Sequence, residues 1–147
     1  MPSIRLVPFA PGHAQLIRLQ PEQWQEVGPS VADAHALKLY QGGPGLTAFS
    51  DDAPLAAAGL VEVHPHYATA WALLGVEAGA AMLPITRAIE RVLCEGVYAR
   101  VDTTVRADFT AGHRWAWMLG FKRLGRLRRW GADGSDFDLY ERINDGC

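Results

Sequence analysis

Hydrophobic and polar residues alternate along this chain in two different periods, which predict where strands and helices lie. Apolar residues that recur at about every second position predict strands over 3–9, 46–50, 55–63, 67–74, 99–105, 121–130 and 137–143. Apolar residues that recur every three or four positions predict helices over 13–19, 31–40, 79–95 and 108–119. Ser30 and Asp108 stand where the second and fourth of these helices begin, and we expect both residues to be N-caps.

The residues between these runs restrict how the elements connect. Asp51-Asp52-Ala53-Pro54 and His64-Pro65-His66 are short turns, so the three strands that they separate should form an antiparallel meander. Pro84 is tolerated only in the first turn of a helix, which places the start of the third helix near Ala80 or Ala81. The resulting order is β-α-α-β-β-β-α-β-α-β-β. We therefore expect an α/β fold of the α+β type over a single domain, 1–147.

Composition and charge exclude several classes of protein. The chain has 147 residues, 49% of them hydrophobic and 20% charged, and a formal net charge of −2, which argues against a general nucleic-acid or membrane-surface binder. The two cysteines make neither a disulfide framework nor a metal site, and Cys94 on the apolar side of a helix is expected to be a small buried residue. Since no apolar run reaches eighteen residues, we expect a cytoplasmic protein.

Basic residues concentrate in one part of the chain. Residues 100–129 contain eight basic and two acidic side chains, and nearly all of the basic ones are arginine. Arginine binds phosphates and carboxylates through its planar fork, so this block is either an anion site or a solvated surface. A nucleic-acid surface is a weaker alternative.

Small residues mark the junction between strand 67–74 and the helix that follows. Gly79, Ala80 and Ala81 stand at the predicted helix start, where unpaired amides and the helix dipole favour phosphate oxygens. Their lack of bulk would let a diphosphate approach the backbone closely. The alternative is a turn of small residues that lets the helix pack tightly on the sheet. No Walker lysine follows, which counts against a nucleoside triphosphate site.

Two short segments, in this order of elements, resemble the GNAT superfamily of acyl-CoA-dependent N-acyltransferases. Residues 76–81, Val-Glu-Ala-Gly-Ala-Ala, match the family's phosphate-loop pattern of Gln or Arg, two residues, Gly, one residue, and Gly or Ala, except that Val76 replaces the polar first residue. Residues 113–121, HRWAWMLGF, resemble the family's aromatic-containing helix that ends in Leu-Gly-Phe. The sequence of these segments is most similar to small, divergent members of the superfamily that bacteriophages encode.

The resemblance implies a GNAT-like, mostly antiparallel sheet of about seven strands flanked by four helices. It also implies transfer of an acyl group, expected to be acetyl from acetyl-CoA, to a primary amine. The pantetheine arm would lie where the fourth and fifth strands diverge, and the backbone N–H of Leu74 (or of Val76) would polarise the thioester carbonyl. The implied cofactor-binding residues are Leu73, Leu74, Gly75, Val76, Gly79, Ala80 and Ala81.

The chain departs from the family pattern at two positions. The tyrosine that often protonates the leaving thiolate is replaced by Ala116, and the asparagine near the start of the same helix is replaced around Phe109. The best candidates for a general base are Glu62 and His64, which face the same side at the end of a predicted strand. Ordinary polar residues at a strand end are the alternative. Tyr67 and Tyr98 are further candidates for a proton donor.

Several alternatives remain open from the residues alone. The missing tyrosine and asparagine are also compatible with a GNAT-fold binding or structural protein that has lost catalysis. Trp24 and Trp71 either line an acceptor pocket or fill the core. Two histidines around Pro65 without further ligands predict no metal site. The amine acceptor is unidentified, nucleic acid and membrane are not expected as partners, and a homodimer is possible.

Overall fold

The computed structural model describes residues 3–23, 32–95 and 97–144. The strands in this part of the chain are β1 (Ile4–Pro8), β2 (Gly45–Ser50), β3 (Ala53–His64), β4 (Tyr67–Leu74), β5 (Arg100–Arg106), β6 (Lys122–Leu127) and β7 (Phe137–Ile143). The helices are α1 (Pro11–Leu16), α3 (Asp33–Gln41), α4 (Met82–Cys94), α5 (Thr110–Met118) and the 3₁₀ helix η1 (Ala78–Ala81). The predicted order and the α/β fold class are confirmed.

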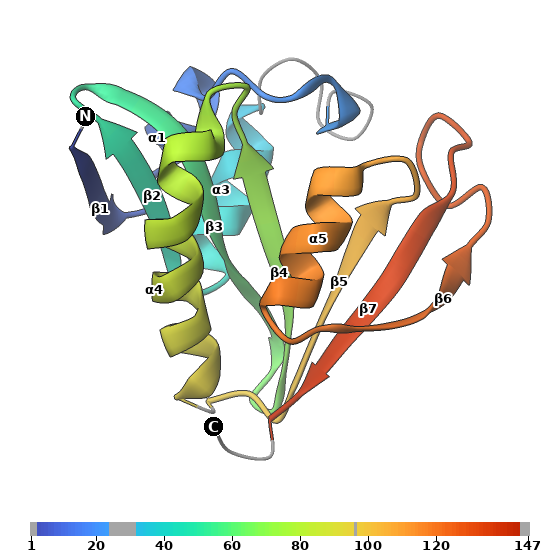
Figure 1. The fold of residues 1–147 in the computed structure, drawn as a ribbon. Coiled ribbons are helices and arrows are strands. Elements are labelled where there is room, and N and C mark those ends of the chain that lie inside the picture. The colour runs from blue at the N-terminus through green and yellow to red at the C-terminus, as the bar shows by residue number, and fades with distance from the viewer. Residues whose placement is uncertain (1–2, 24–31, 96, 145–147) are drawn as a thin grey trace.

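The strands form one sheet in the order β1-β2-β3-β4-β5-β7-β6 (Figure 1). Neighbouring strands are antiparallel except β4 and β5, which are parallel. The β3–β4 hairpin pairs Ala56 with Leu74 at one end and His64 with Tyr67 at the other, as the short turn at His64-Pro65-His66 predicts. The mostly antiparallel sheet expected from the resemblance is therefore present.

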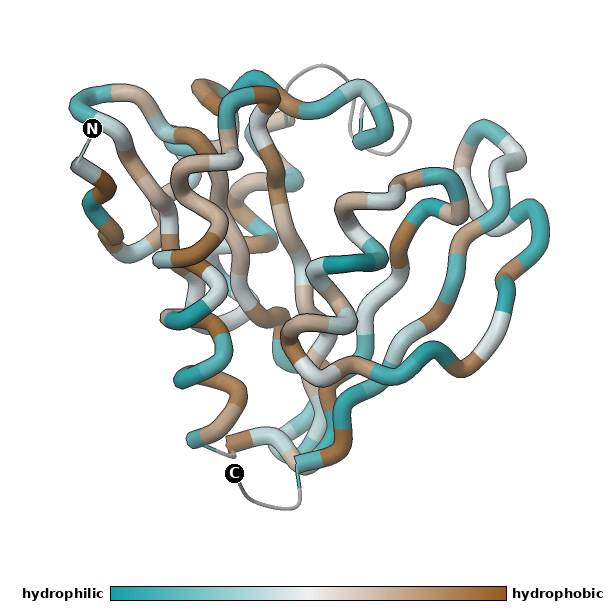
Figure 2. The backbone as a smooth tube through the Cα atoms, in the orientation of Figure 1, coloured by the Kyte–Doolittle hydropathy of each residue, from teal (hydrophilic) through white to brown (hydrophobic). Residues whose placement is uncertain are grey.

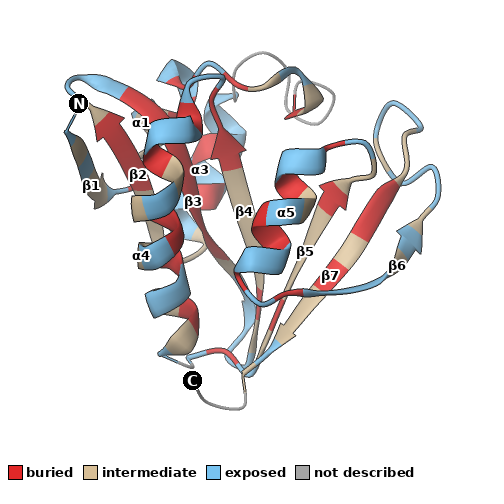
Figure 3. Ribbon diagram, in the orientation of Figure 1, coloured by how far each residue is buried: buried red, intermediate tan, exposed pale blue. Residues whose placement is uncertain are grey.

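Helices cover both faces of the sheet, α4 and α5 on one face and α1 and α3 on the other (Figure 1). The alternation of side chains along β3 divides the core between these layers. Ala56 and Ala58 belong to the hydrophobic cluster that includes α4 and α5, whereas Ala57 belongs to the cluster under α1 and α3. Figure 3 shows buried residues on the sheet-facing sides of α4 and α5, while β6 at the edge is mostly exposed.

Three details of the helices differ from the prediction. The first helix, predicted over 13–19, begins at Pro11, where a proline costs no hydrogen bond. Phe109 rather than Asp108 is the N-cap of α5, because the Asp108 carboxylate is bound to Arg106 instead. Cys94 is half-buried at the end of α4 and is not a free cysteine. Ser30, the other predicted cap, lies outside the described residues.

Hydropathy follows the same division between core and surface. Figure 2 shows hydrophobic segments along the central strands and more hydrophilic segments toward the β6–β7 end. Within the described residues, no helix combines the length and the apolar character needed to cross a lipid bilayer.

Candidate active site: the cleft between β4 and β5

The parallel strands β4 and β5 pair over only three residues and then diverge. The pairs run from Tyr67–Arg100 to Thr69–Asp102, and beyond them β4 continues to Leu74 without pairing to β5. Figure 1 shows the two strands together at one end and apart at the other. Since a strand that loses its neighbour exposes backbone N–H and C=O groups, the divergence creates an edge inside the sheet.

Side chains hold the closed end of this divergence together. The Asp102 carboxylate accepts hydrogen bonds from the Tyr67 hydroxyl at 2.5 Å and from the Thr69 hydroxyl at 3.0 Å. The hydrogen bond to Asp102, which is the largest cause, and burial raise the pKa of Tyr67. One residue further, the Thr103 hydroxyl donates to the carbonyl of Ala70 at 3.0 Å, so a side chain continues the contact where backbone pairing has ended.

The open end is a cavity of about 340 Å³ that is lined from both faces of the sheet. Residues of β4 and β5 form its walls, α5 contributes from one face and α3 from the other. The lining includes Trp71, Leu73, Thr104, Phe109, Trp115 and Ala116. The two positions where the family's asparagine and tyrosine are missing therefore lie in this lining. A cavity of this size is typical of small-molecule sites.

One glutamine occupies the β4 edge inside the cleft. The Gln23 side chain accepts a hydrogen bond from the N–H of Leu74 at 2.7 Å and donates one to the carbonyl of Ala72 at 2.8 Å. Gln23 is 7% exposed. The predicted oxyanion donor, the N–H of Leu74, is therefore not free but already donates to a side chain.

The backbone N–H groups after Leu74 are hydrogen-bonded as well, one to β3 and one to the segment that follows α1 and crosses the end of β4. The N–H of Gly75 donates to the carbonyl of Leu55 at 2.9 Å, and the N–H of Val76 donates to the carbonyl of Arg18 at 2.7 Å. A Cβ at position 75 would lie 2.4 Å from the Leu55 oxygen, so only glycine permits this approach. The expectation of an open backbone edge over 73–76 needs correction: Leu74, Gly75 and Val76 all donate within the chain. A role in cofactor binding for these residues remains a prediction.

Two of the small residues in the loop at 76–81 are accessible to solvent. Gly79 and Ala80 are exposed, and a Cβ built at Gly79 would meet no atom within 4 Å. Ala81 is fully buried and forms the N-cap of α4, so the helix starts one or two residues after the predicted position. The turn thus serves tight packing through Ala81 and leaves open space over Gly79.

The predicted general bases lie at the other end of the sheet. Glu62 is paired with Ala68, six residues before Leu74 along β4, a separation of about 20 Å at the usual rise per residue. The Glu62 carboxylate accepts a hydrogen bond from the Tyr98 hydroxyl at 2.9 Å, and His64 contacts the turn at His66 through its ring nitrogen. Neither Glu62 nor His64 lines the cleft.

The titratable side chain that sequence reasoning missed is His35 on α3. It is exposed and lines the cleft on the face opposite α4 and α5. Partial burial, together with the nearby charge of Lys38, lowers the pKa of His35 below its usual 6.5, which favours the neutral imidazole. A single histidine in a helix with few apolar contacts gives no signal in the sequence.

Trp71 lies on the same face of the cleft as His35. Its ring packs edge-on against Phe9 with 4.9 Å between the ring centres, and its buried indole N–H has no hydrogen-bond partner among the described residues. Gly59 allows this packing, because a Cβ there would lie 2.8 Å from the Trp71 ring. Trp71 thus packs in the core and also lines the cavity. Trp24, predicted beside it, lies outside the described residues.

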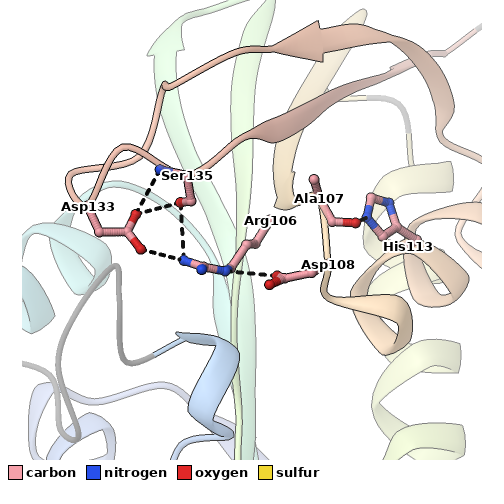
Figure 4. Close-up of polar contacts among 6 residues, drawn as sticks. All are labelled: Arg106, Ala107, Asp108, His113, Asp133 and Ser135. Carbon is pink, nitrogen blue, oxygen red and sulfur yellow. Dashed lines mark hydrogen bonds and ion pairs between the residues drawn. The ribbon is translucent and has the colours of Figure 1, made fainter.

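The arginines of 100–129 are largely held by carboxylates. Figure 4 shows Arg106, at the open end of β5, bound to Asp108 at 2.8 Å and to Asp133 at 3.0 Å. Ser135 and Arg106 lower the pKa of Asp133 to about 2. The same figure shows His113 against the carbonyl of Ala107, a contact that fastens α5 to the end of β5.

A second acid neutralises two more arginines on β6. The Asp138 carboxylate, 4% exposed, contacts Arg123 at 3.2 Å and Arg126 at 3.1 Å. Burial alone would raise the pKa of Asp138, but the two guanidinium groups lower it. These pairs leave less free positive charge than the sequence suggests. Within the described ranges, no group of three His, Cys, Asp or Glu side chains could hold a metal ion.

No protein-family model matches this sequence, and no curated protein sequence matches it. Solved structures do match over nearly the whole chain. Ard1 from Thermoplasma volcanium superimposes with a TM-score of 0.77 at 14% identity, covering 96% of this chain and 97% of its own. The GNAT-family acetyltransferase from Streptococcus pneumoniae gives 0.72 at 14% identity, covering 97% and 99%. The protein yncA from Salmonella typhimurium, with its cofactor acetyl-CoA, gives 0.75 at 10% identity, covering 97% and 94%. The chain therefore has the fold of the GNAT acetyltransferases.

Proposed function

We propose that the protein is an acyl-CoA-dependent N-acyltransferase that uses the cleft between β4 and β5. The observation that carries the proposal is the divergence of these strands after Thr69 and Asp102 into a cavity of about 340 Å³. The similarity of fold to yncA, whose structure holds acetyl-CoA, supports acetyl-CoA as the donor. The acceptor is expected to be a primary amine.

The described residues fit an acyl-CoA in two respects. The β4 edge at Ala72 and Leu74 has one carbonyl and one N–H on the side of the cleft, where both now bind the side-chain amide of Gln23. Groups that bind this amide also suit the amides of an extended pantetheine arm. The open space over Gly79, with Ala80 beside it and α4 behind, suits the diphosphate. In this assignment Leu73, Gly75, Val76 and Ala81 shape the backbone around these contacts.

Acyl transfer forms a C–N bond between the amine and the acyl carbon and breaks the C–S bond of the thioester. The attacking amine must lose a proton, and the leaving thiolate must gain one. His35 lines the cleft with a lowered pKa and is our candidate to accept the amine proton. Glu62 and His64 are the competing candidates. With Ala116 in place of a tyrosine, the proton held by the base can return to the thiolate.

Thermal denaturation with and without acetyl-CoA tests binding, and thiol release with a panel of primary amines tests turnover. At one hundred times its dissociation constant, a ligand adds about 2.7 kcal/mol to stability, so the melting temperature should rise clearly. An unchanged melting temperature would reject the binding proposal. Binding without thiol release for any amine would instead favour a GNAT-fold protein that has lost catalysis. Size-exclusion chromatography at the same concentrations tests the predicted homodimer.

A further inference from the structure

We propose that Gln23 is an internal competitor of the acyl-CoA, so that binding at β4 is an exchange of the Gln23 amide for the amide groups of the ligand. The inference rests on the proposed function, because it concerns how that cleft accepts its co-substrate. It adds a gating side chain to the site.

The contacts of Gln23 reproduce those of a neighbouring strand. Ala72 and Leu74 are two residues apart on β4, so their backbone groups point to the same edge. A strand beside this edge would donate an N–H to the carbonyl of Ala72 and accept the N–H of Leu74 with its own carbonyl. The carboxamide of Gln23 does both, at 2.8 Å and 2.7 Å. The side chain therefore completes the ladder that β5 leaves unfinished.

Burial explains why this position is filled. Gln23 is 7% exposed and Leu74 is 2% exposed, so water has little access to the bonds between them. A buried N–H or C=O without a partner is unfavourable, and Gln23 satisfies one of each. The two amides of the pantetheine arm can replace it, the N–H of one donating to the carbonyl of Ala72 and the C=O of the other accepting from the N–H of Leu74. Exchange thus keeps both backbone groups paired, but the ligand can bind only the fraction of molecules in which Gln23 has moved away.

The nearby Gln20 provides a matched control. It belongs to the same crossing segment, and its side-chain amide donates to the carbonyl of Gly75 at 3.2 Å. It touches neither Ala72 nor the N–H of Leu74 through its side chain. A Gln20→Ala variant therefore loses a side-chain contact to the same turn without uncovering the β4 edge.

The test is calorimetric titration of acetyl-CoA into wild type, Gln23→Ala and Gln20→Ala. Removal of the competitor should tighten acetyl-CoA binding by about tenfold, since apparent affinity scales with the fraction of the competent state. Gln20→Ala should match wild type. Unchanged or weaker binding by Gln23→Ala, with wild type binding normally, overturns the exchange alone. If wild type does not bind acetyl-CoA, the proposed function fails and the exchange falls with it.

A measurement on the wild type keeps the proposal testable if Gln23→Ala does not fold. In ¹⁵N spectra, the side-chain amide protons of Gln23 should be protected from solvent exchange without ligand and lose that protection at saturating acetyl-CoA. Those of Gln20 should change little. Protection of Gln23 that persists in the saturated complex overturns the exchange.

Discussion

The hydroxyl of Thr103 donates a hydrogen bond to the carbonyl of Ala70 over 3.0 Å, one residue beyond the last pair of β4 and β5. Thr103→Val keeps the shape of the side chain and removes this bond, so the free energy of unfolding should fall by about 1 kcal/mol. Thr104→Val is the control, since Thr104 lines the cleft but the hydroxyl that bonds to Ala70 belongs to Thr103. Urea denaturation measures both. Equal losses in the two variants would mean that the bond across the gap contributes nothing of its own.

A substitution at Gly79 distinguishes the two explanations of the small residues in the loop at 76–81, which are binding of a diphosphate and tight packing of α4 on the sheet. A side chain at position 79 meets no atom within 4 Å, so Gly79→Val should change the free energy of unfolding by less than about 0.5 kcal/mol. If a diphosphate approaches this backbone, the same variant should bind CoA at least about tenfold more weakly. Gly12→Val, in equally open surroundings on α1, should bind CoA like wild type. Normal CoA affinity in Gly79→Val would leave the loop with a packing role only.

His35 should control the pH dependence of turnover. Because the pKa of His35 is lowered by burial, the activity of the wild type should decrease at a pH below 6.5 as the imidazole becomes protonated. His35→Asn should reduce kcat by about 100-fold or more at pH 7 and leave the KM for acetyl-CoA unchanged. Glu62→Gln and His64→Asn should stay within a few-fold of wild type. A large loss in either of those variants, with His35→Asn active, would restore the base predicted from the sequence.

His13 should make the fold sensitive to mild acid. Its Nδ1 accepts the N–H of Ala10 at 3.1 Å and lies 2.9 Å from the hydroxyl of the fully buried Thr47. Burial lowers the pKa of His13, so below pH 6.5 the unfolded chain binds a proton that the folded state resists. Stability should therefore be constant above pH 6.5 and fall below it, with a slope of up to about 1.4 kcal/mol per pH unit for this one proton.

The check on His13 is a series of urea unfolding curves between pH 5 and 7.5. His13→Asn should flatten the slope below pH 6.5, and His35→Asn should remove a further part because the pKa of His35 is lowered as well. An unchanged slope in His13→Asn would assign the acid sensitivity to other groups.

Local patterns predicted the fold well where a signal lies within a few residues. The turn at His64-Pro65-His66 fixed the hairpin, and Pro84 placed the start of α4 within two residues. The predicted N-cap of α5 was wrong because the Asp108 carboxylate binds Arg106 and not the start of the helix. A helix pattern in the sequence contains no information on that contact. Propensity describes what a residue can do alone, and a neighbouring charge can override it.

The site was harder to predict because its contacts connect distant parts of the chain. Gln23 and Leu74 are separated by 51 residues, and nothing in the composition around either residue indicates that they meet. Glu62 and His64 do share a strand end, but the prediction that they face the same side was wrong: a register shift between them pairs Glu62 with Ala68 and His64 with Tyr67, and these neighbours on β4 face opposite sides of the sheet. The alternation also does not say which end of the sheet is open. The resemblance supplied the divergence of β4 and β5, and the sequence alone offered no side chain for the β4 edge.

The three residue pairs between β4 and β5 are the only backbone ladder that joins the strands of residues 4–74 to those of residues 100–143 within the described ranges. Each half of the sheet is otherwise antiparallel and contiguous in the chain. The polypeptide can therefore be regarded as two fragments that dock along a short seam, and a cut in the connection between α4 and β5 would leave every other ladder intact. Split at that place, the two halves would have to reassemble through these three pairs and through the buried hydrophobic cluster to which both contribute.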